Sequence, residues 1–162
     1  MPESTTLEAI KRAMDAEMAA HTYYSQSAQK ATNPKGKDMF RQLAALELNH
    51  YNNLKALHGS LHEGNGWIAY DGTQFSDTTH APKGTDPSRE EDFKDDVLSI
   101  LSKAIEDEKK ASAYYTTLAN ETTNPAGKAL FSKLAEDEKV HTKILNDQWY
   151  SLNNQGVWLW GD

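Results

Sequence analysis

The feature that most constrains this chain is an internal repeat. Residues 7–57 align without a gap on residues 98–148, at a shift of 91 residues. About a third of the aligned positions are identical, and self-similarity at a fixed shift indicates one structural unit used twice. The matched stretches include TNPKGKDMF with TNPAGKALF and LAALELNH with LAEDEKVH. Any fold for this chain must therefore place two similar units together.

Each repeat unit has the pattern of a helix hairpin. Leu7, Ile10, Met14 and Met18 recur at spacings of three or four residues, which is the period of an amphipathic helix rather than of a strand. A Thr-Asn-Pro-x-Gly break interrupts each unit, and its proline favours the end of a helix. A second helical pattern follows each break. The predicted helices span residues 5–31, 35–58, 92–122 and 126–150.

Two such hairpins predict an all-α four-helix bundle. The whole chain, 1–162, reads as a single domain with hairpins at 5–58 and 92–150. A long crossover loop, 59–91, joins the hairpins, and an aromatic tail, 151–162, ends the chain.

The aromatic residues of the two connecting segments have predicted roles. We expect Trp67, Tyr70 and Phe75 to hold the crossover against the side of the bundle. The tail packs either on the bundle end or on a partner chain. Exposed tryptophans in the tail would be costly in water and would mark an interface. This reasoning predicts a homodimer, in which the long crossover would permit exchange of hairpins.

Composition excludes several functions. The chain has no cysteine, which excludes disulfides, thiolate metal sites, iron–sulfur clusters and a cysteine nucleophile. Its net charge of −7 argues against binding to nucleic acid or to an anionic membrane. No apolar run approaches a membrane span, and the N-terminus has no apolar signal region. A cytoplasmic location is the resulting expectation.

Six polar residues occupy equivalent places in the two hairpins. A Glu-x-x-His pair lies on the second helix of each hairpin, and this spacing puts both side chains on one helix face. A single glutamate lies on or beside the apolar stripe of each first helix. Antiparallel hairpins can bring all of them to one level of the core. The predicted metal ligands are Glu17, Glu47, His50, Glu108, Glu138 and His141.

Charge gives the physical reason for two metal ions. Four buried glutamates would not stay ionised together without compensation, and two divalent cations balance them while the imidazoles stay neutral. Glu47 and Glu138 would bridge the metals, and Glu17 and Glu108 would be terminal ligands. A single Glu-x-x-His on a helix is usually a solvated pair. The complete set occurs twice at one fixed shift, which favours a metal site.

Tyrosines accompany the glutamates of the first helices. Tyr24 and Tyr115 follow Glu17 and Glu108 by seven residues, on the ligand face. They are either aromatic core residues or hydrogen-bond donors to a ligating carboxylate of the opposite hairpin. Tyr23 and Tyr114 are offset and are expected to pack or to face solvent.

Several polar residues near the ligands are predicted to lie outside the site. His21, whose counterpart is Ser112, is expected to be a partly buried or surface histidine rather than a ligand. The charged helix positions are expected to form a solvated face; they include Lys109, Lys110, Glu136 and Asp137. Ala20 and Ala111, one turn from the ligands, leave room for an exogenous ligand or for close helix approach.

These motifs together resemble those of the rubrerythrin-type branch of the ferritin-like superfamily. The resemblance rests on Glu-x-x-Ala-x-x-x-Tyr at 17–24 and 108–115, and on Phe-x-x-Leu-Ala-x-x-Glu-x-x-His at 40–50 and 131–141. It implies a ferritin-like bundle and a non-haem di-iron centre that reacts with hydrogen peroxide or dioxygen. It also implies that the six residues above are ligands.

Two features depart from the typical family pattern. Typical rubrerythrins carry a cysteine-rich rubredoxin domain, which this chain lacks, so electrons would come from a separate, rubredoxin-like carrier. Typical members also carry an extra glutamate near the first glutamate of the third helix. Here the residue is Ala111, which makes the site more symmetric and closer to the ferroxidase centre of bacterioferritin.

Three functions remain open from the sequence. The leading one is a di-iron oxidoreductase, a peroxidase or ferroxidase. The second is iron storage or delivery without turnover, and the third is a structural bundle that holds zinc or no metal. Manganese or zinc could replace iron, because carboxylate and imidazole ligands suit all three metals.

Overall fold

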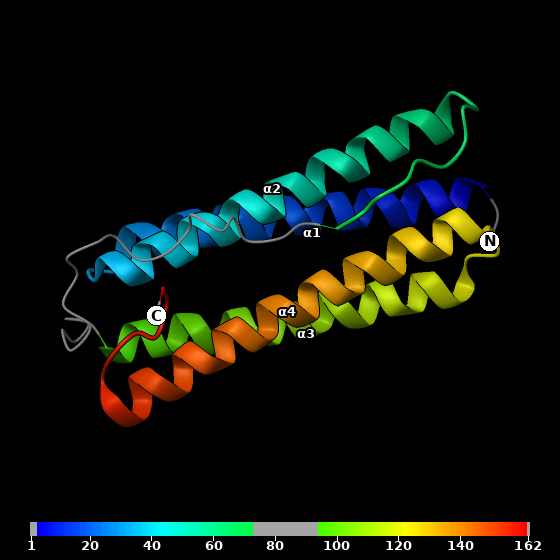
Figure 1. Ribbon diagram of the computed structural model, residues 1–162. Helices are drawn as coiled ribbons and strands as arrows, with labels where there is room; N and C mark the ends of the chain where they lie inside the picture. The colour runs from blue at the N-terminus through cyan, green and yellow to red at the C-terminus, as the bar shows by residue number, and fades with distance from the viewer. Residues whose placement is uncertain (1–2, 73–93, 162) are drawn as a thin grey trace.

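The computed structural model describes residues 3–72 and 94–161, and it confirms the predicted four-helix bundle (Figure 1). Helices α1 (Glu3–Lys30) and α2 (Pro34–His62) form one antiparallel hairpin, and α3 (Lys94–Glu121) and α4 (Pro125–Gln155) form the other. Across the interface between the hairpins, α1 and α3 lie in backbone contact with each other. Among the described helices, none combines the length and apolar character that crossing a membrane requires. Phe75 lies outside the described residues.

The hairpin turns follow from the Thr-Asn-Pro-x-Gly sequence. The Asn33 side chain accepts a hydrogen bond from the Lys35 N–H, and Pro34 occupies the first turn of α2, where its missing N–H costs nothing. Asn124 and Pro125 do the same for α4. The lysine that follows each turn reaches back to the preceding helix. Lys37 Nζ donates to the Ala28 carbonyl and Lys128 Nζ to the Ala119 carbonyl.

Two of the helices continue beyond their predicted ends. Helix α2 runs to His62 rather than 58, and α4 runs to Gln155 rather than 150, so the first five residues of the predicted tail are helical. Gly156 ends α4 in the left-handed conformation, with φ of 75°, and its N–H donates to the carbonyls of Ser151 and Leu152. The Asn-Asn-Gln sequence before Gly156 has no apolar period, so pattern reasoning ended the helix too early.

The structural repeat extends past the helices into the segments that follow them. Trp67 and Trp158 are equivalent under the 91-residue shift, and each packs edge-on against a phenylalanine of the opposite hairpin, Phe131 and Phe40 respectively. Matched hydrogen bonds accompany them, from Ser60 Oγ to the Gly66 carbonyl and from Ser151 Oγ to the Val157 carbonyl. Each hairpin is thus held to the other by an exchanged tryptophan.

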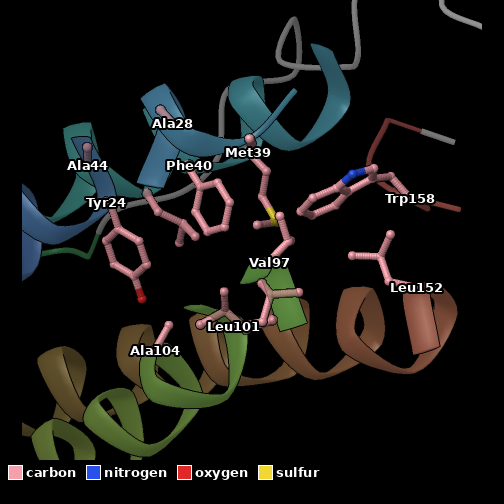
Figure 2. Close-up of a cluster of buried hydrophobic side chains, with 13 residues drawn as sticks. Tyr24, Ala28, Met39, Phe40, Ala44, Val97, Leu101, Ala104, Leu152 and Trp158 are labelled. Atoms are coloured by element: carbon pink, nitrogen blue, oxygen red, sulfur yellow. The ribbon is translucent and has the colours of Figure 1, made fainter. Parts of the chain in front are cut away.

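This packing settles where the tail lies. Trp158 is 1% exposed, and Figure 2 shows it beside Met39 and Phe40 in the apolar core. Trp160 donates its indole N–H to Asp38, and Trp149 is partly buried against the same core. Of the two predicted places for the tail, the bundle end of its own chain is the observed one, so these tryptophans are not the exposed residues on which the dimer argument depended. The homodimer stays a prediction, without the tail as its argument.

Two apolar clusters form the core, one in each half of the bundle. One contains Phe40, Leu101 and Trp158, and the other contains Ile10, Leu57 and Phe131. Each helix carries one predicted glutamate ligand. Along the helix, this glutamate lies between residues of one cluster and residues of the other. The polar site is therefore enclosed by apolar layers at both ends.

The packing of Trp158 generates a test with an internal control. A Cβ added at Gly36 would lie 2.7 Å from Trp158 Cε2, whereas a Cβ at Gly59 of the same helix meets nothing within 4 Å. We expect Gly36→Ala to destabilise the protein by roughly 1–3 kcal/mol through overpacking. Gly59→Ala should stabilise it by about 0.5–1 kcal/mol, because alanine favours the helix interior. Urea unfolding of both variants measures the difference; equal stabilities would contradict the tail's position.

Candidate metal centre

The structure brings the six predicted residues together in the middle of the bundle. All six side chains are at most 3% exposed, and each comes from the expected helix: Glu17 from α1, Glu47 and His50 from α2, Glu108 from α3, Glu138 and His141 from α4. Their donor atoms form two overlapping groups, within each of which all the atoms lie within 4.8 Å of one another. Whether these atoms bind a metal stays a prediction.

The two groups share two carboxylates. One contains Glu17, Glu47, His50 and Glu138, and the other contains Glu47, Glu108, Glu138 and His141. Glu47 and Glu138 thus belong to both, as bridging ligands would, and each remaining glutamate belongs to one. The two imidazole rings are nearly parallel, with centroids 6.0 Å apart.

Both histidines turn the same nitrogen toward the carboxylates. His50 Nδ1 lies 3.3 Å from Glu17 Oε1 and 3.2 Å from Glu138 Oε1. His141 Nδ1 lies 2.8 Å from Glu47 Oε1 and 3.4 Å from Glu108 Oε1. The Nδ1 atoms of the two rings therefore converge on the four carboxylates.

Several glutamate oxygens point into the site without a hydrogen-bond donor. Within the described part of the chain, one oxygen each of Glu17, Glu108 and Glu138 and both oxygens of Glu47 accept no hydrogen bond. Buried carboxylate oxygens normally have partners, and leaving them unsatisfied costs free energy. Four carboxylates and two imidazoles form a donor set for hard to borderline divalent metals. The residues present therefore fit a pair of such ions.

The protein environment separates the glutamates into two classes. Burial, together with the charges of the neighbouring glutamates, raises the pKa of Glu47 and that of Glu138 well above the ordinary value. Burial also acts to raise the pKa of Glu17 and that of Glu108. For these two, hydrogen bonds and histidine charges outweigh burial, and the pKa is lowered. Burial and like charge thus favour the protonated forms of the predicted bridging pair, Glu47 and Glu138, over their ionised forms.

Tyrosine hydroxyls cross from each hairpin to the other. Tyr24 donates to Glu108 Oε1 and Tyr115 donates to Glu17 Oε1, both at 2.6 Å. Figure 2 shows the Tyr24 ring extending from α1 toward the α3–α4 hairpin. Burial, followed by the charge of the carboxylate it contacts, raises the pKa of each hydroxyl well above 10, so both remain protonated donors.

The neighbouring tyrosines also join the hairpins, which the sequence did not indicate. Tyr23 donates to the Ile100 carbonyl at 2.8 Å, and Tyr114 donates to the Ala9 carbonyl at 2.9 Å. Both pairs of partners are equivalent under the repeat. The 91-residue shift is the signal that could have revealed this pairing.

A cavity leads to the carboxylates from the face between α1 and α3. Its volume is about 480 Å³, and Glu17, Glu47, Glu108 and Glu138 are among its lining residues. Its walls include small side chains, namely Ala13, Ala16, Ala20, Ala104 and Ala111. The exposed cations Arg12, Lys103 and Lys110 also line it. The site is thus open to small molecules on this face.

The α2–α4 side of the site holds a buried acid that the sequence analysis placed wrongly. Asp137 was expected on the solvated face, as Lys109, Lys110 and Glu136 are, but it is 6% exposed. Its Oδ2 lies 3.0 Å from His50 Nε2 and accepts a 2.5 Å hydrogen bond from the Tyr70 hydroxyl. The crossover brings Tyr70 over this position, a long-range contact that helix periodicity cannot indicate.

His21 lies outside the metal centre. Its Nδ1 is 2.7 Å from the Ala44 carbonyl, and the equivalent residue Ser112 donates to the Ala135 carbonyl at 3.1 Å. Both side chains therefore make the same link between neighbouring helices, and His21 is absent from both clusters of converging donor atoms.

Comparison with known proteins gives a family and a fold. The model of the rubrerythrin family matches residues 8–87 and 99–157. A solved structure of a hypothetical protein from Pyrococcus furiosus superimposes with a TM-score of 0.73 at 22% sequence identity, over 94% of this chain and 92% of that one. No curated protein matches the chain. The match over most of its length shows that the chain belongs to the rubrerythrin family.

Proposed function

We propose that this protein is a di-iron oxidoreductase that consumes hydrogen peroxide or dioxygen. The observation that carries the proposal is the pair of overlapping donor groups, which share Glu47 and Glu138. Such a set holds two cations at bridging distance and balances their charge with four carboxylates. Membership of the rubrerythrin family favours iron as the metal.

The four glutamates would have two different roles, which follow from their positions. Glu47 and Glu138 would bridge the two ions, and Glu17 and Glu108 would each complete one of them. Iron, when bound, supplies the two electrons that convert one peroxide and two protons into two waters. The cavity between α1 and α3 admits the oxidant, and the apolar layers at both ends limit access by bulk water.

The two buried tyrosines hold the terminal carboxylates in place. The Tyr24 hydroxyl fixes one oxygen of Glu108, and the Tyr115 hydroxyl fixes one oxygen of Glu17. The other oxygen of each carboxylate is left for a metal ion. The chain contains no cysteine for an iron–sulfur centre. Electrons for a further cycle would therefore come from a separate carrier, such as a rubredoxin-like protein.

Reaction stoichiometry tests the function. After anaerobic loading with two Fe(II) per chain, one equivalent of peroxide should oxidise both ions, with the appearance of a ferric absorption band. A parallel reaction with dioxygen shows which oxidant is faster. Glu47→Gln should bind fewer than two iron ions per chain, because the substitution removes a negative charge that both ions would share. Glu136→Gln, which alters an exposed residue, is the matched control. Peroxide consumption no faster than with free iron would reject the proposal.

The tyrosines provide a second comparison. The double variant Tyr24→Phe/Tyr115→Phe removes both hydrogen bonds to the carboxylates, and we expect a roughly 10–100-fold loss of metal affinity, as for other residues that orient ligands. The control variant Tyr23→Phe/Tyr114→Phe removes hydrogen bonds to backbone carbonyls only. It should lower stability by about 1 kcal/mol per bond. It should leave metal affinity unchanged. Anaerobic Co(II) titration measures the metal affinity of both double variants. Equal losses of metal affinity in the two would contradict the proposed role of Tyr24 and Tyr115.

The raised pKa values predict how metal binding depends on pH. Without metal, Glu47 and Glu138 retain protons in the folded protein at pH values where the unfolded chain, with a carboxyl pKa near 4.5, has released them. The folded state then binds more protons, so its stability falls as pH rises above about 4.5. Burial acts to lower the pKa of His50, but the hydrogen bonds that its ring donates to Asp137 and Glu17 raise this pKa well above 6.5. The stability therefore falls further above that pH.

Metal ions should reverse this loss, because they take the place of the protons. The increase in melting temperature on adding Co(II) should therefore be clearly larger near pH 7.5 than near pH 5.5. The lowered pKa values of Glu17 and Glu108 act below 4.5 and do not change the sign in this range. Thermal unfolding with and without metal at the two pH values makes the measurement. An increment that is the same at both would contradict the proton-for-metal exchange.

A further inference from the structure

The cavity between α1 and α3 is far larger than hydrogen peroxide requires. Its volume is about 480 Å³, and it reaches the four predicted glutamate ligands. Water occupies about 30 Å³ per molecule in the liquid, so a peroxide with two oxygen atoms needs on the order of 60 Å³. Sites that enclose organic ligands have volumes of roughly 300–1,000 Å³. The cavity therefore has room for an organic molecule next to the predicted metal positions.

The walls of this cavity suit an apolar ligand. They contain the alanines named above and four tyrosines, Tyr23, Tyr24, Tyr114 and Tyr115. Every one of these tyrosine hydroxyls already donates a hydrogen bond, either to a backbone carbonyl or to a glutamate. The tyrosines therefore offer a ligand mainly the apolar surfaces of their rings.

The charges that line the cavity break the internal repeat. Arg12 and Lys103 are equivalent under the 91-residue shift, and both line the cavity. Lys103 Nζ lies 2.5 Å from Oδ2 of Asp107, four residues later on the same helix. The residue equivalent to Asp107 is Ala16, so Arg12 lacks the acid that its counterpart has. Among the residues that the structure describes, Arg12 makes no ion pair with any carboxylate.

A second cation lies at the same end of the cavity. The two tyrosine-to-carbonyl bonds between α1 and α3 show that these helices run antiparallel, and they place Lys110 near the level of Arg12. Lys110 also makes no ion pair in the described part of the chain, and its equivalent in the first repeat is Ala19. One end of the cavity thus carries two cations without acidic partners, whereas Lys103 at the other end is paired with Asp107. This distribution of charge is complementary to an anion.

The spacing along α1 indicates the length of such a ligand. Arg12 precedes the predicted ligand Glu17 by five residues, which is about 7.5 Å along the helix axis. A guanidinium group binds a carboxylate through two parallel hydrogen bonds, so arginine suits a carboxylate better than lysine does. A molecule that contacts both Arg12 and the metal positions therefore needs an apolar body between its carboxylate and its reactive group.

We propose that the cavity selects an organic hydroperoxide that carries a carboxylate, with the carboxylate at Arg12 and the hydroperoxide group toward Glu47 and Glu138. This inference rests on the proposed function, because a pair of Fe(II) ions is the reductant. The O–O bond breaks, each Fe(II) gives one electron, and two protons from solvent are taken up. The products are an alcohol, water and two Fe(III). Hydrogen peroxide would gain neither the apolar contacts nor the Arg12 contact.

Binding of an unreactive product analogue tests the cavity without any redox reaction. The probe is 4-(2-hydroxypropan-2-yl)benzoate, the alcohol formed from cumene hydroperoxide with a para carboxylate, and its neutral match is 2-phenyl-2-propanol. Calorimetric titration uses protein loaded with Zn(II), which cannot supply electrons. The wild type should bind the carboxylate probe roughly 3–10-fold more tightly than the neutral alcohol. Arg12→Gln should remove this preference. Lys11→Gln removes an exposed charge outside the cavity lining and should keep it.

The repeat supplies a second pair of variants. Ala16→Asp gives Arg12 the acid that Asp107 provides for Lys103, at a position whose equivalent already holds an aspartate. This variant should lose the preference for the carboxylate probe as Arg12→Gln does. Ala16→Asn has the same shape without the charge and should keep the preference. The proposal is overturned if Arg12→Gln keeps the preference, or if Ala16→Asp and Ala16→Asn show the same one.

Oxidation rates of the Fe(II)-loaded protein separate this inference from the proposed function. Three oxidants are compared anaerobically, namely hydrogen peroxide, cumene hydroperoxide and its para-carboxylated form, and each rate is divided by the rate with free Fe(II). The carboxylated form should show the largest gain, at least about 10-fold above that of hydrogen peroxide, because its apolar body is buried. A fast reaction with hydrogen peroxide and no larger gain for the carboxylated form would overturn the inference and leave the proposed function intact. If no peroxide reacts faster than with free iron, the proposed function fails and the inference fails with it.

Discussion

The cost of placing four carboxylates out of water governs the centre of this molecule. Glu17, Glu47, Glu108 and Glu138 lie together between two apolar layers, where burial removes most of the surrounding water and like charges repel strongly. Burial and mutual repulsion raise the pKa of Glu47 and that of Glu138, so protonation of these two residues lowers this cost in part. Two divalent cations would meet it in full. The same constraint explains why both tyrosines donate across the hairpin interface, since each stabilises one carboxylate that remains charged.

Much of the frame could be predicted because the repeat displays it twice. The helix period, the Asn-Pro caps and the Glu-x-x-His spacing are local features, and local features can be read from neighbouring residues. One Glu-x-x-His alone would have carried little weight. Its recurrence at the same shift as Phe40 and Phe131, both core residues, placed it on the buried face and so located the site.

Apart from the helix ends, what the sequence analysis missed concerns contacts between distant parts of the chain. Asp137 resembles a surface acid from its neighbours Glu136 and Lys139, yet the crossover covers it with Tyr70. Trp158 resembles an exposed residue of a terminal tail, yet it fills a space over Gly36 that no side chain at that position could share. Neither contact has a periodic signal. The equivalence of Trp67 and Trp158 was nevertheless present in the 91-residue shift, beyond the end of the aligned helices.

The internal repeat also helps to decide which departures from symmetry have chemical consequences. His21 and Ser112 differ in type, but both bond to equivalent carbonyls, so the change preserves one structural role. Asp137 and Leu46 differ in a way that preserves nothing, because leucine cannot accept a hydrogen bond. A buried acid is expensive unless its partners compensate for it, and here both partners, His50 and Tyr70, are in place. Asp137 therefore gives His50 a hydrogen bond that the sequence repeat alone does not predict.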